Sequence, residues 1–312
     1  MTDHSMKSGL APIVFFAYNR PEHTRQTLDA LSKNYLASAS TLYIFIDGPK
    51  DNATIETREK IDEVKKIAGE KSWCGTVNII AAEKNKGLFK SIANGITQTV
   101  NKFGKVIVIE DDVLVSPGFL SYMNDGLDFY ENTPAVMHIS GFSRAEFSAV
   151  DIKESTYFFN HTTCWGWATW KRAWDKFTPD ALAVKNVISK KGNIKKLNMD
   201  NSFEFFWGLK AIAEGKFQSW NTIWHSIVFL NNGFCLHPKK SLVSNIGHDG
   251  SGTNCTPDSD FGSNDLLADT IIITSIPIKE NEAVQSFYRA QHSFKYRVIF
   301  FIKHYLRYLN RY

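Results

Sequence analysis

The 312-residue sequence has little cysteine and little net charge. Its four cysteines, Cys74, Cys164, Cys235 and Cys255, form no CxxC pair, so their spacing suits neither a zinc site nor a disulfide framework. We therefore expect reduced thiols, which are typical of a cytosolic protein. The net charge of +4 does not indicate nucleic acid as a partner.

The sequence also lacks the segments that direct a chain into or across a membrane. Residues 1–9 are polar and contain no apolar stretch of a signal peptide. No apolar run approaches the roughly 18 residues that a spanning helix needs. We expect a cytoplasmic protein that at most lies peripherally on the inner face of a membrane.

Two phosphate-binding motifs are absent, GxGxxG and GxxxxGK[ST], which excludes a dinucleotide fold and a P-loop NTPase. Instead, apolar strands and amphipathic helices alternate over residues 12–115. The predicted strands are 12–17, 41–46, 77–81 and 105–109, and the predicted helices are 22–34, 54–68 and 88–103. This alternation predicts a parallel sheet with helices on both faces.

The second half of the chain is richer in aromatic residues and less regular. It predicts helices at 119–131 and 198–215, a strand at 136–140, and a strand that starts at 157–159 and runs on to 170. Residues 245–254, NIGHDGSGTN, are rich in glycine and short polar side chains. Such a segment is typical of a connector or of a lid that orders over a ligand.

The C-terminal tail, residues 283–312, carries no acidic residue from Phe287 onward, and its basic and aromatic residues are interleaved. This pattern is typical of a helix that lies on an anionic membrane surface. A terminal helix docked on the core, with solvated Lys and Arg side chains, explains the pattern equally well.

Three acidic residues, Glu110, Asp111 and Asp112, directly follow the apolar strand 105–109. Carboxylates at the end of a buried strand repel each other and lose hydration, so a fold tolerates them best beside a cation. Mg²⁺ and Mn²⁺ prefer carboxylate oxygens, and Mg²⁺ typically uses one or two of them together with substrate phosphates. A helix N-cap is the alternative explanation, but a cap needs only one acid.

Four loops follow the four predicted parallel strands and should meet at one edge of the sheet, where ligands bind in open α/β folds. They begin at Tyr18, Asp47, Lys84 and Glu110. Arg20 and Lys86 can neutralise phosphate, Gly87 allows a tight turn, and Asp47 can accept hydrogen bonds from a base or a ribose. This set suits a nucleotide that carries a diphosphate.

Five segments carry a resemblance to a known family: AYNRPE, IDGPK, NKGLFKSIANGI, VIEDDVLVSPGF and CWGWATW. Over roughly residues 12–250 the chain resembles GT-A-fold nucleotide-sugar glycosyltransferases, in particular the N-acetylglucosaminyltransferase I-like group and its bacterial relatives. EDD is similar to their DXD signature. The resemblance implies an α/β fold of GT-A type over residues 1–282, an open and mostly parallel sheet flanked by helices. A nucleotide-sugar-binding half would span 10–118 and an acceptor-binding half 119–282.

The resemblance also implies roles for individual residues around the donor. Asp47 would hold the uracil or ribose, and Asp112 would bind Mn²⁺ or Mg²⁺ directly. His248 would be a later ligand of the metal or the diphosphate. The other residues implied to contact the nucleotide sugar are Ala17, Tyr18, Arg20, Glu110 and Asp111.

The catalytic base is the carboxylate that takes the proton from the acceptor hydroxyl in inverting members. The resemblance places it at the start of the helix after the CWGWATW segment, where Glu204 and Asp200 stand. Glu204 lies eleven residues before Gly215, a spacing similar to that of related transferases. Some members carry this acid in a Trp-Asp-Asp-Trp setting, but here residues 220–224 read WNTIW.

The sequence therefore predicts a hexosyl- or N-acetylhexosaminyltransferase in surface polysaccharide synthesis. It would move a sugar from a nucleotide-diphosphate donor to a hydroxyl of a glycan or lipid-linked acceptor. The favoured donor is a UDP-sugar. Two alternatives are a sugar-nucleotide nucleotidyltransferase and a non-catalytic carbohydrate-binding protein. The first is disfavoured because its usual Gly-rich opening loop is replaced by AYNRPE.

Overall fold

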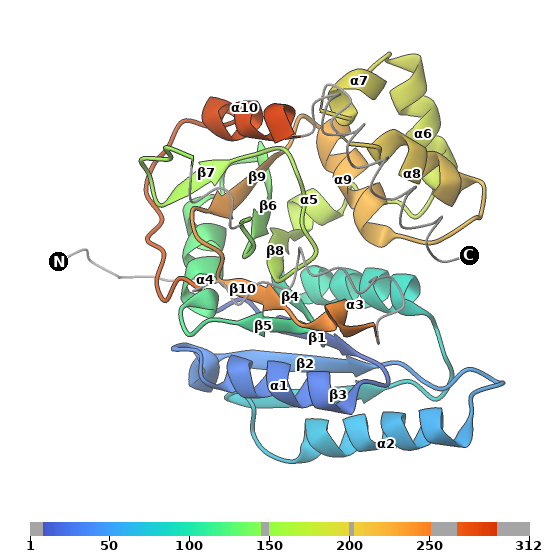
Figure 1. Ribbon diagram of the computed structural model, residues 1–312. Coiled ribbons are helices and arrows are strands. Elements are labelled where there is room, and N and C mark those ends of the chain that lie inside the picture. Colours follow the sequence, from blue (N-terminus) through green and yellow to red (C-terminus); the bar gives the residue numbers. More distant parts are fainter. Residues whose placement is uncertain (1–8, 145–149, 200–202, 251–266, 292–312) are drawn as a thin grey trace, which may run out of the picture.

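A computed structural model describes residues 9–144, 150–199, 203–250 and 267–291 (Figure 1). In these residues the strands form an eight-stranded sheet of order β3-β2-β1-β4-β8-β6-β9-β7 and a two-stranded ribbon, β10-β5. The predicted α/β class with an open, mostly parallel sheet flanked by helices is confirmed.

The first half contains the predicted parallel unit. Its strands are β1 (Ile13–Ala17), β2 (Thr41–Ile46), β3 (Thr76–Ala81) and β4 (Lys105–Glu110), and its helices are α1 (Pro21–Ser32), α2 (Ile55–Gly69) and α3 (Leu88–Phe103), with a short 3₁₀ turn at Ala37–Ala39. β1 is buried along its whole length between parallel neighbours, with Ile13 opposite Leu42 and Ile107. Continuous apolar runs of this kind are typical of parallel strands covered on both faces.

Helices cover both faces of this sheet, as predicted. Leu28 of α1 and Ile61 of α2 belong to the core on one face, and Ile92 and Ile96 of α3 belong to the core on the other. Figure 1 shows α3 above the sheet and α2 below it, with α1 in front of β2 and β3. Helix α3 ends at Gly104, whose φ of 80° is a left-handed conformation that glycine adopts readily.

The second half extends the sheet with mainly antiparallel strands. Its elements are α4 (Phe119–Phe129), β6 (Val136–Ser140), β7 (Thr156–Phe158), β8 (Trp167–Trp170), α5 (Lys171–Trp174), α6 (Ala181–Lys190), α7 (Ile194–Leu197), α8 (Phe205–Ala213), α9 (Trp220–Leu230), β9 (Phe234–Pro238) and α10 (Glu282–Gln291). β8 joins the halves by pairing antiparallel with β4, Val108 opposite Trp167.

Two sequence-based boundaries in this half were wrong. Residues 157–170 form two strands, β7 and β8, that lie on opposite sides of β6 and β9 in the sheet order. The predicted helix 198–215 is shorter, because α8 begins only at Phe205. The helix α6 was not predicted at all. Its N-cap is Asp180, whose side chain accepts a hydrogen bond from the Ala183 amide.

The ribbon of β5 (Val113–Val115) and β10 (Val243–Asn245) joins distant parts of the chain. It is antiparallel, with Val113 opposite Asn245, and the short turn Gly247–Asp249 follows it directly. The ribbon therefore brings residues 245–250 of the predicted Gly-rich segment back to the acidic cluster that ends β4, whereas residues 251–254 lie outside the described residues.

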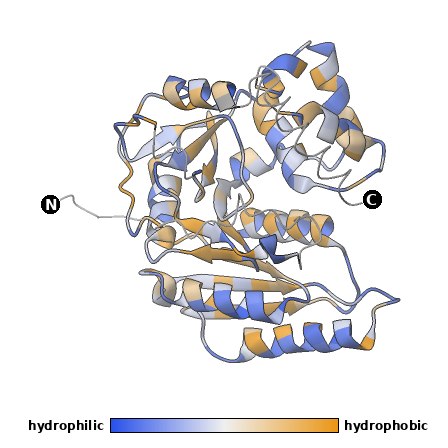
Figure 2. Ribbon diagram, in the orientation of Figure 1, coloured by the Kyte–Doolittle hydropathy of each residue, from blue (hydrophilic) through white to orange (hydrophobic). Residues whose placement is uncertain are grey.

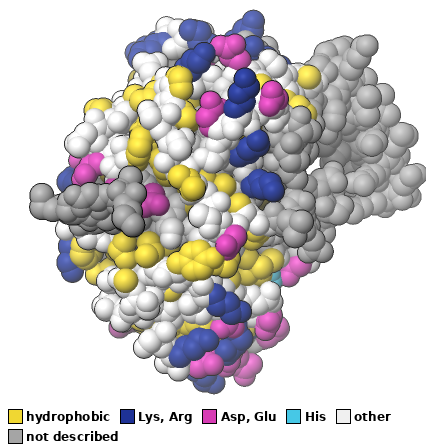
Figure 3. All heavy atoms as spheres, turned by 90° about the vertical axis from the view of Figure 1, so that its left-hand side faces the viewer, with side chains coloured by type: hydrophobic (Ala, Val, Ile, Leu, Met, Phe, Trp, Pro, Cys, Tyr) yellow, Lys and Arg dark blue, Asp and Glu magenta, His cyan; other side chains and the backbone are white. Residues whose placement is uncertain are grey.

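Apolar side chains concentrate on the strands and on the inward faces of the helices, as Figure 2 shows. On the face seen in Figure 3, side chains of both charge signs are interspersed and hydrophobic side chains are exposed between them. None of the described helices is long and apolar enough to span a membrane. Most of the predicted membrane-binding tail, residues 292–312, lies outside the described residues.

Candidate functional site

The acidic cluster lies where β4 ends, next to the start of α1. The Arg20 side chain donates from one nitrogen, Nη2, to Asp111 Oδ1 and to Asp112 Oδ2, the latter at 3.0 Å. The Asp111 and Asp112 side chains are only 5% and 11% exposed. Thr27 Oγ1 of α1 donates to the Asp111 carbonyl at 2.8 Å, which ties the helix to the cluster. The predicted proximity of Arg20, Asp111 and Asp112 is confirmed.

The electrostatics of this cluster show that one guanidinium does not balance three acids. Burial, followed by the charges of Asp112 and Asp111, raises the pKa of Glu110 to about 8. Burial also raises the pKa of Asp111 to about 6, although Arg20 opposes the shift. Burial disfavours the charged form of Arg20, but the two aspartates outweigh it and raise the pKa of Arg20 overall. The cluster thus favours additional positive charge.

The donor set fits a divalent cation that arrives with phosphate oxygens. Carboxylate oxygens are hard ligands of the type that Mg²⁺ and Mn²⁺ bind. In the described part of the chain, no three His, Cys, Asp or Glu side chains are grouped to hold a metal ion. A cation here would therefore rely on one or two carboxylates, and on a diphosphate and water for its other ligands.

The segment after β10 packs directly on Asp112. The Ile246 amide donates to the Asp112 carbonyl at 2.9 Å, and the Gly247 amide donates to Asn245 Oδ1 at 2.7 Å. A Cβ atom on Gly247 would lie 2.3 Å from Asp112 Oδ2. Only glycine fits at this position without moving the carboxylate, so Gly247 and Asn245 help to set where Asp112 points.

Two histidines flank this contact. His23 Nε2 of α1 lies 3.3 Å from both the Ile246 carbonyl oxygen and Asp249 Oδ2. The predicted ligand His248 is the next residue after Gly247, and its ring packs edge-on against Trp165 with 5.7 Å between centroids. The structure thus brings His248 to the region of the acidic cluster. Sequence reasoning missed His23, because a lone histidine on a predicted helix face carries no recognisable pattern.

The Asp47 carboxylate organises the loop after β3. Oδ1 accepts from the amides of Gly48 at 2.9 Å and Lys86 at 2.8 Å. Oδ2 accepts from the Gly87 amide at 2.9 Å and from Asn85 Nδ2 at 3.0 Å. These four bonds match the roughly four lone-pair positions that a carboxylate offers. Asp47 therefore holds the loop that leads into α3, and Asn85 is a partner that the sequence did not indicate.

The remaining predicted donor residues line the same edge. Ala17 ends β1, and its carbonyl accepts from the Asp47 amide at 3.1 Å. Tyr18 is half-buried and packs against the core. The Lys86 side chain is exposed, while Gly87 adopts a φ of 80° directly before α3. The four loops meet at the carboxyl edge of the sheet, as the parallel topology requires.

The two indoles of the CWGWATW segment have different environments. Trp167 is fully buried and stacks on Trp220, with 5.2 Å between ring centroids. Trp165 is only partly buried, and the β4–β8 register places it at the edge of the sheet where β4 ends. Trp167 is therefore a core residue, and of these two indoles only that of Trp165 is near the site.

The two predicted bases are not equally placed. Asp200 lies outside the described residues. Glu204 immediately precedes α8 and its side chain is exposed. Its neighbours Phe203 and Phe205 stack on each other at 5.0 Å, and both contact the ring of His161. The backbone of Glu204 is therefore held between two packed rings, while the residue itself is exposed.

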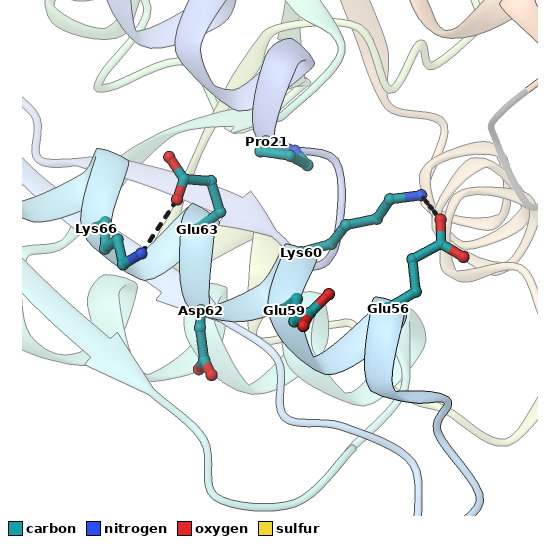
Figure 4. Close-up of a pocket in the computed structure, with 7 residues that line it drawn as sticks. All are labelled: Pro21, Glu56, Glu59, Lys60, Asp62, Glu63 and Lys66. Carbon is teal, nitrogen blue, oxygen red and sulfur yellow. Dashed lines mark hydrogen bonds and ion pairs between the residues drawn. The ribbon is translucent and has the colours of Figure 1, made fainter.

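A shallow hollow beside α1 is a different feature (Figure 4). It lies between Pro21 and the outer surface of α2. The charged residues that line it are Glu56, Glu59, Lys60, Asp62, Glu63 and Lys66. Lys60 pairs with Glu56 at 2.7 Å and Lys66 with Glu63 at 3.4 Å. Four acidic side chains against two lysines leave this helix surface with excess negative charge, so the hollow does not resemble a diphosphate site.

The sheet, the acidic cluster at the end of β4 and the adjoining loops are the arrangement that the resemblance to nucleotide-sugar glycosyltransferases implies. Residues 2–182 match the model of the GNT-I family, and the chain belongs to this family. The predicted resemblance is confirmed. A comparison with curated proteins gave no match.

Several solved structures are similar to this chain at low identity and with TM-scores below 0.5. Mannosyltransferase PcManGT from Pyrobaculum calidifontis, in complex with GDP-Man and Mn²⁺, is 12% identical with a TM-score of 0.42, over 71% of this chain and 69% of that one. TarS from S. aureus is 11% identical with a TM-score of 0.40, over 75% of this chain but only 36% of TarS. A UDP-glucose pyrophosphorylase complexed with UDP-glucose is 12% identical with a TM-score of 0.38, over 73% and 90% of the two chains.

Proposed function

We propose that this glycosyltransferase depends on Mn²⁺ or Mg²⁺ and moves a hexosyl or N-acetylhexosaminyl group from a UDP-linked donor to a hydroxyl of a glycan or lipid-linked acceptor. The observation that supports the proposal is the buried acidic cluster at the end of β4, where Asp111 and Asp112 share the single guanidinium of Arg20. Surface polysaccharide synthesis at the inner face of a membrane is the proposed setting.

The donor would bind along the carboxyl edge of β1, β2 and β4. Asp112 would hold the cation, with His248 as a further ligand, and the cation would stabilise negative charge on the departing diphosphate. Arg20 and Lys86 would contact phosphate oxygens, since guanidinium and ammonium groups both pair with phosphate. Asp47 would support the nucleotide through the Lys86–Gly87 loop that it fixes.

The acceptor would enter from the second half of the chain. Glu204 would take the proton from its hydroxyl, because this carboxylate is exposed at a fixed backbone position before α8. Trp165, at the edge of the sheet, would offer an indole face to a sugar. Asp200 is the competing base in the sequence.

The test is release of nucleotide from a panel of nucleotide sugars with Mn²⁺. Asp112→Ala should abolish turnover, whereas the exposed Asp62→Ala on α2 should not. Glu204→Gln should lower kcat at least a hundredfold, as loss of a general base does. Glu214→Gln, at the other end of α8, is its matched control. Full activity of Asp112→Ala would refute the metal-binding role of Asp112. Full activity of Glu204→Gln would show that Glu204 is not the base and would favour Asp200.

A further inference from the structure

Arg20 lies between the side chains of Asp111 and Asp112, where a bound metal cation would also be expected. A single atom, Nη2, bridges a carboxylate oxygen of Asp111 and one of Asp112. Both ion pairs recorded for these aspartates in the described residues go to that nitrogen. The positive charge of Arg20 and a divalent ion bound by Asp112 would therefore compete for the same carboxylate.

The backbone of Arg20 is fixed, and its side chain is more exposed than those of the aspartates with which it pairs. Arg20 is the N-cap of α1, its carbonyl accepts from the Thr24 amide at 2.9 Å, and Pro21 follows it. The Arg20 side chain is 18% exposed, compared with 5% for Asp111. The guanidinium thus reaches the cluster from the solvent side, on a long stem that can rotate without disturbing the helix.

We propose that Arg20 is a stand-in for the cation, which holds the aspartates until the donor arrives and then moves onto the diphosphate. This inference rests on the proposed function. A cation that binds without the diphosphate is repelled by the guanidinium of Arg20. A diphosphate that binds without the cation is repelled by the carboxylates of Asp111 and Asp112. When both bind, Arg20 exchanges one set of anionic oxygens for another. Cation and donor should therefore bind cooperatively, and the coupling must be reciprocal.

The experiment measures Mn²⁺ binding to the full-length protein by electron paramagnetic resonance, with and without UDP. The variants are Arg20→Gln, Arg20→Lys and the control Arg25→Gln. Arg25 forms a surface ion pair, with 2.8 Å between its Nη1 and Glu70 Oε2. Without UDP, Arg20→Gln should bind Mn²⁺ about ten- to a hundredfold more tightly than wild type, the range expected for a lost charged hydrogen bond. It should bind UDP more weakly, and UDP should strengthen Mn²⁺ binding less than it does in wild type, because only the direct contacts between metal and diphosphate would remain.

Arg20→Lys keeps the charge without the planar fork, so it guards against misfolding of the glutamine variant and should retain part of the coupling. Arg25→Gln should match wild type. Mn²⁺ binding to Arg20→Gln that equals or falls below that of wild type, or coupling to UDP that is unchanged, would overturn the inference. If wild type still turns over a nucleotide sugar with Mn²⁺, only the inference fails. If wild type binds neither Mn²⁺ with UDP nor any donor, the proposed function fails with it.

Discussion

Replacement of Asp47 by asparagine tests whether this carboxylate holds the loop between β3 and α3. An amide has one acceptor oxygen, so it can satisfy only one of the two donor pairs that Asp47 satisfies. The other pair, either the amides of Gly48 and Lys86 or the Gly87 amide with Asn85, would face an NH₂ group. Asp47→Asn therefore removes two hydrogen bonds and sets donors against donors.

The magnitude follows from the burial of the site. Asp47 is 7% exposed, and a hydrogen bond to a charged group contributes roughly 1.5–3 kcal/mol. Asn85 is only partly buried, and water can replace some of what is lost there. We expect the variant to lose about 2–4 kcal/mol of unfolding free energy in total.

The assay combines urea unfolding with hydrogen exchange of the peptide that covers residues 82–88. The Lys86 and Gly87 amides should lose protection more than amides of α3, and UDP binding should weaken because the loop is no longer fixed. The control is Asp51→Asn. Asp51 is exposed and, like Asp47, lies in the loop that follows β2. A variant within about 0.5 kcal/mol of wild type, the range of ordinary surface substitutions, with unchanged exchange would refute the reasoning.

Two further predictions follow from packing and from burial. Gly247→Ala puts a methyl group 2.3 Å from Asp112 Oδ2, so metal-dependent nucleotide release should fall at least tenfold; unchanged kcat would show that the carboxylate does not need this glycine. Burial lowers the pKa of His225 to about 4, below the unfolded value near 6.5, so its stabilising effect is complete above pH 6.5 and is lost as the pH falls toward 4. Wild type should lose about 2 kcal/mol through this group between pH 6.5 and 5, and urea unfolding of His225→Asn should show a flatter dependence on pH.

The first half of the fold was predictable because β1 and β4 are buried, continuous apolar runs and each helix has a regular apolar side. The boundaries of β2, α3 and β6 agree with the prediction residue for residue. The second half was less predictable because its order in the sheet depends on long-range pairing, such as that of β8 with β4. Apolar periodicity alone does not reveal which strand is a neighbour.

The candidate site was predictable where chemistry is concentrated in short segments. The acids at 110–112 and Arg20 stand at strand ends, so topology alone brings them together. The sequence did not reveal the roles of Gly247, Asn245 and His23, because these depend on the β5–β10 ribbon. The two strands of this ribbon have only three paired residues each, too few to give a recognisable sequence pattern. The roles assigned to Asp200 and to the tail stay predictions, since these residues lie beyond the described ranges.

The ribbon has a consequence for how the protein is made. The Ile246 amide and Gly247 reach Asp112 across more than a third of the chain. During synthesis, the N-terminal sheet can emerge and fold while its acidic end still lacks this support. Competence to act on a donor should therefore appear only late in translation, and an isolated N-terminal fragment should be an incomplete enzyme even if its sheet is well formed.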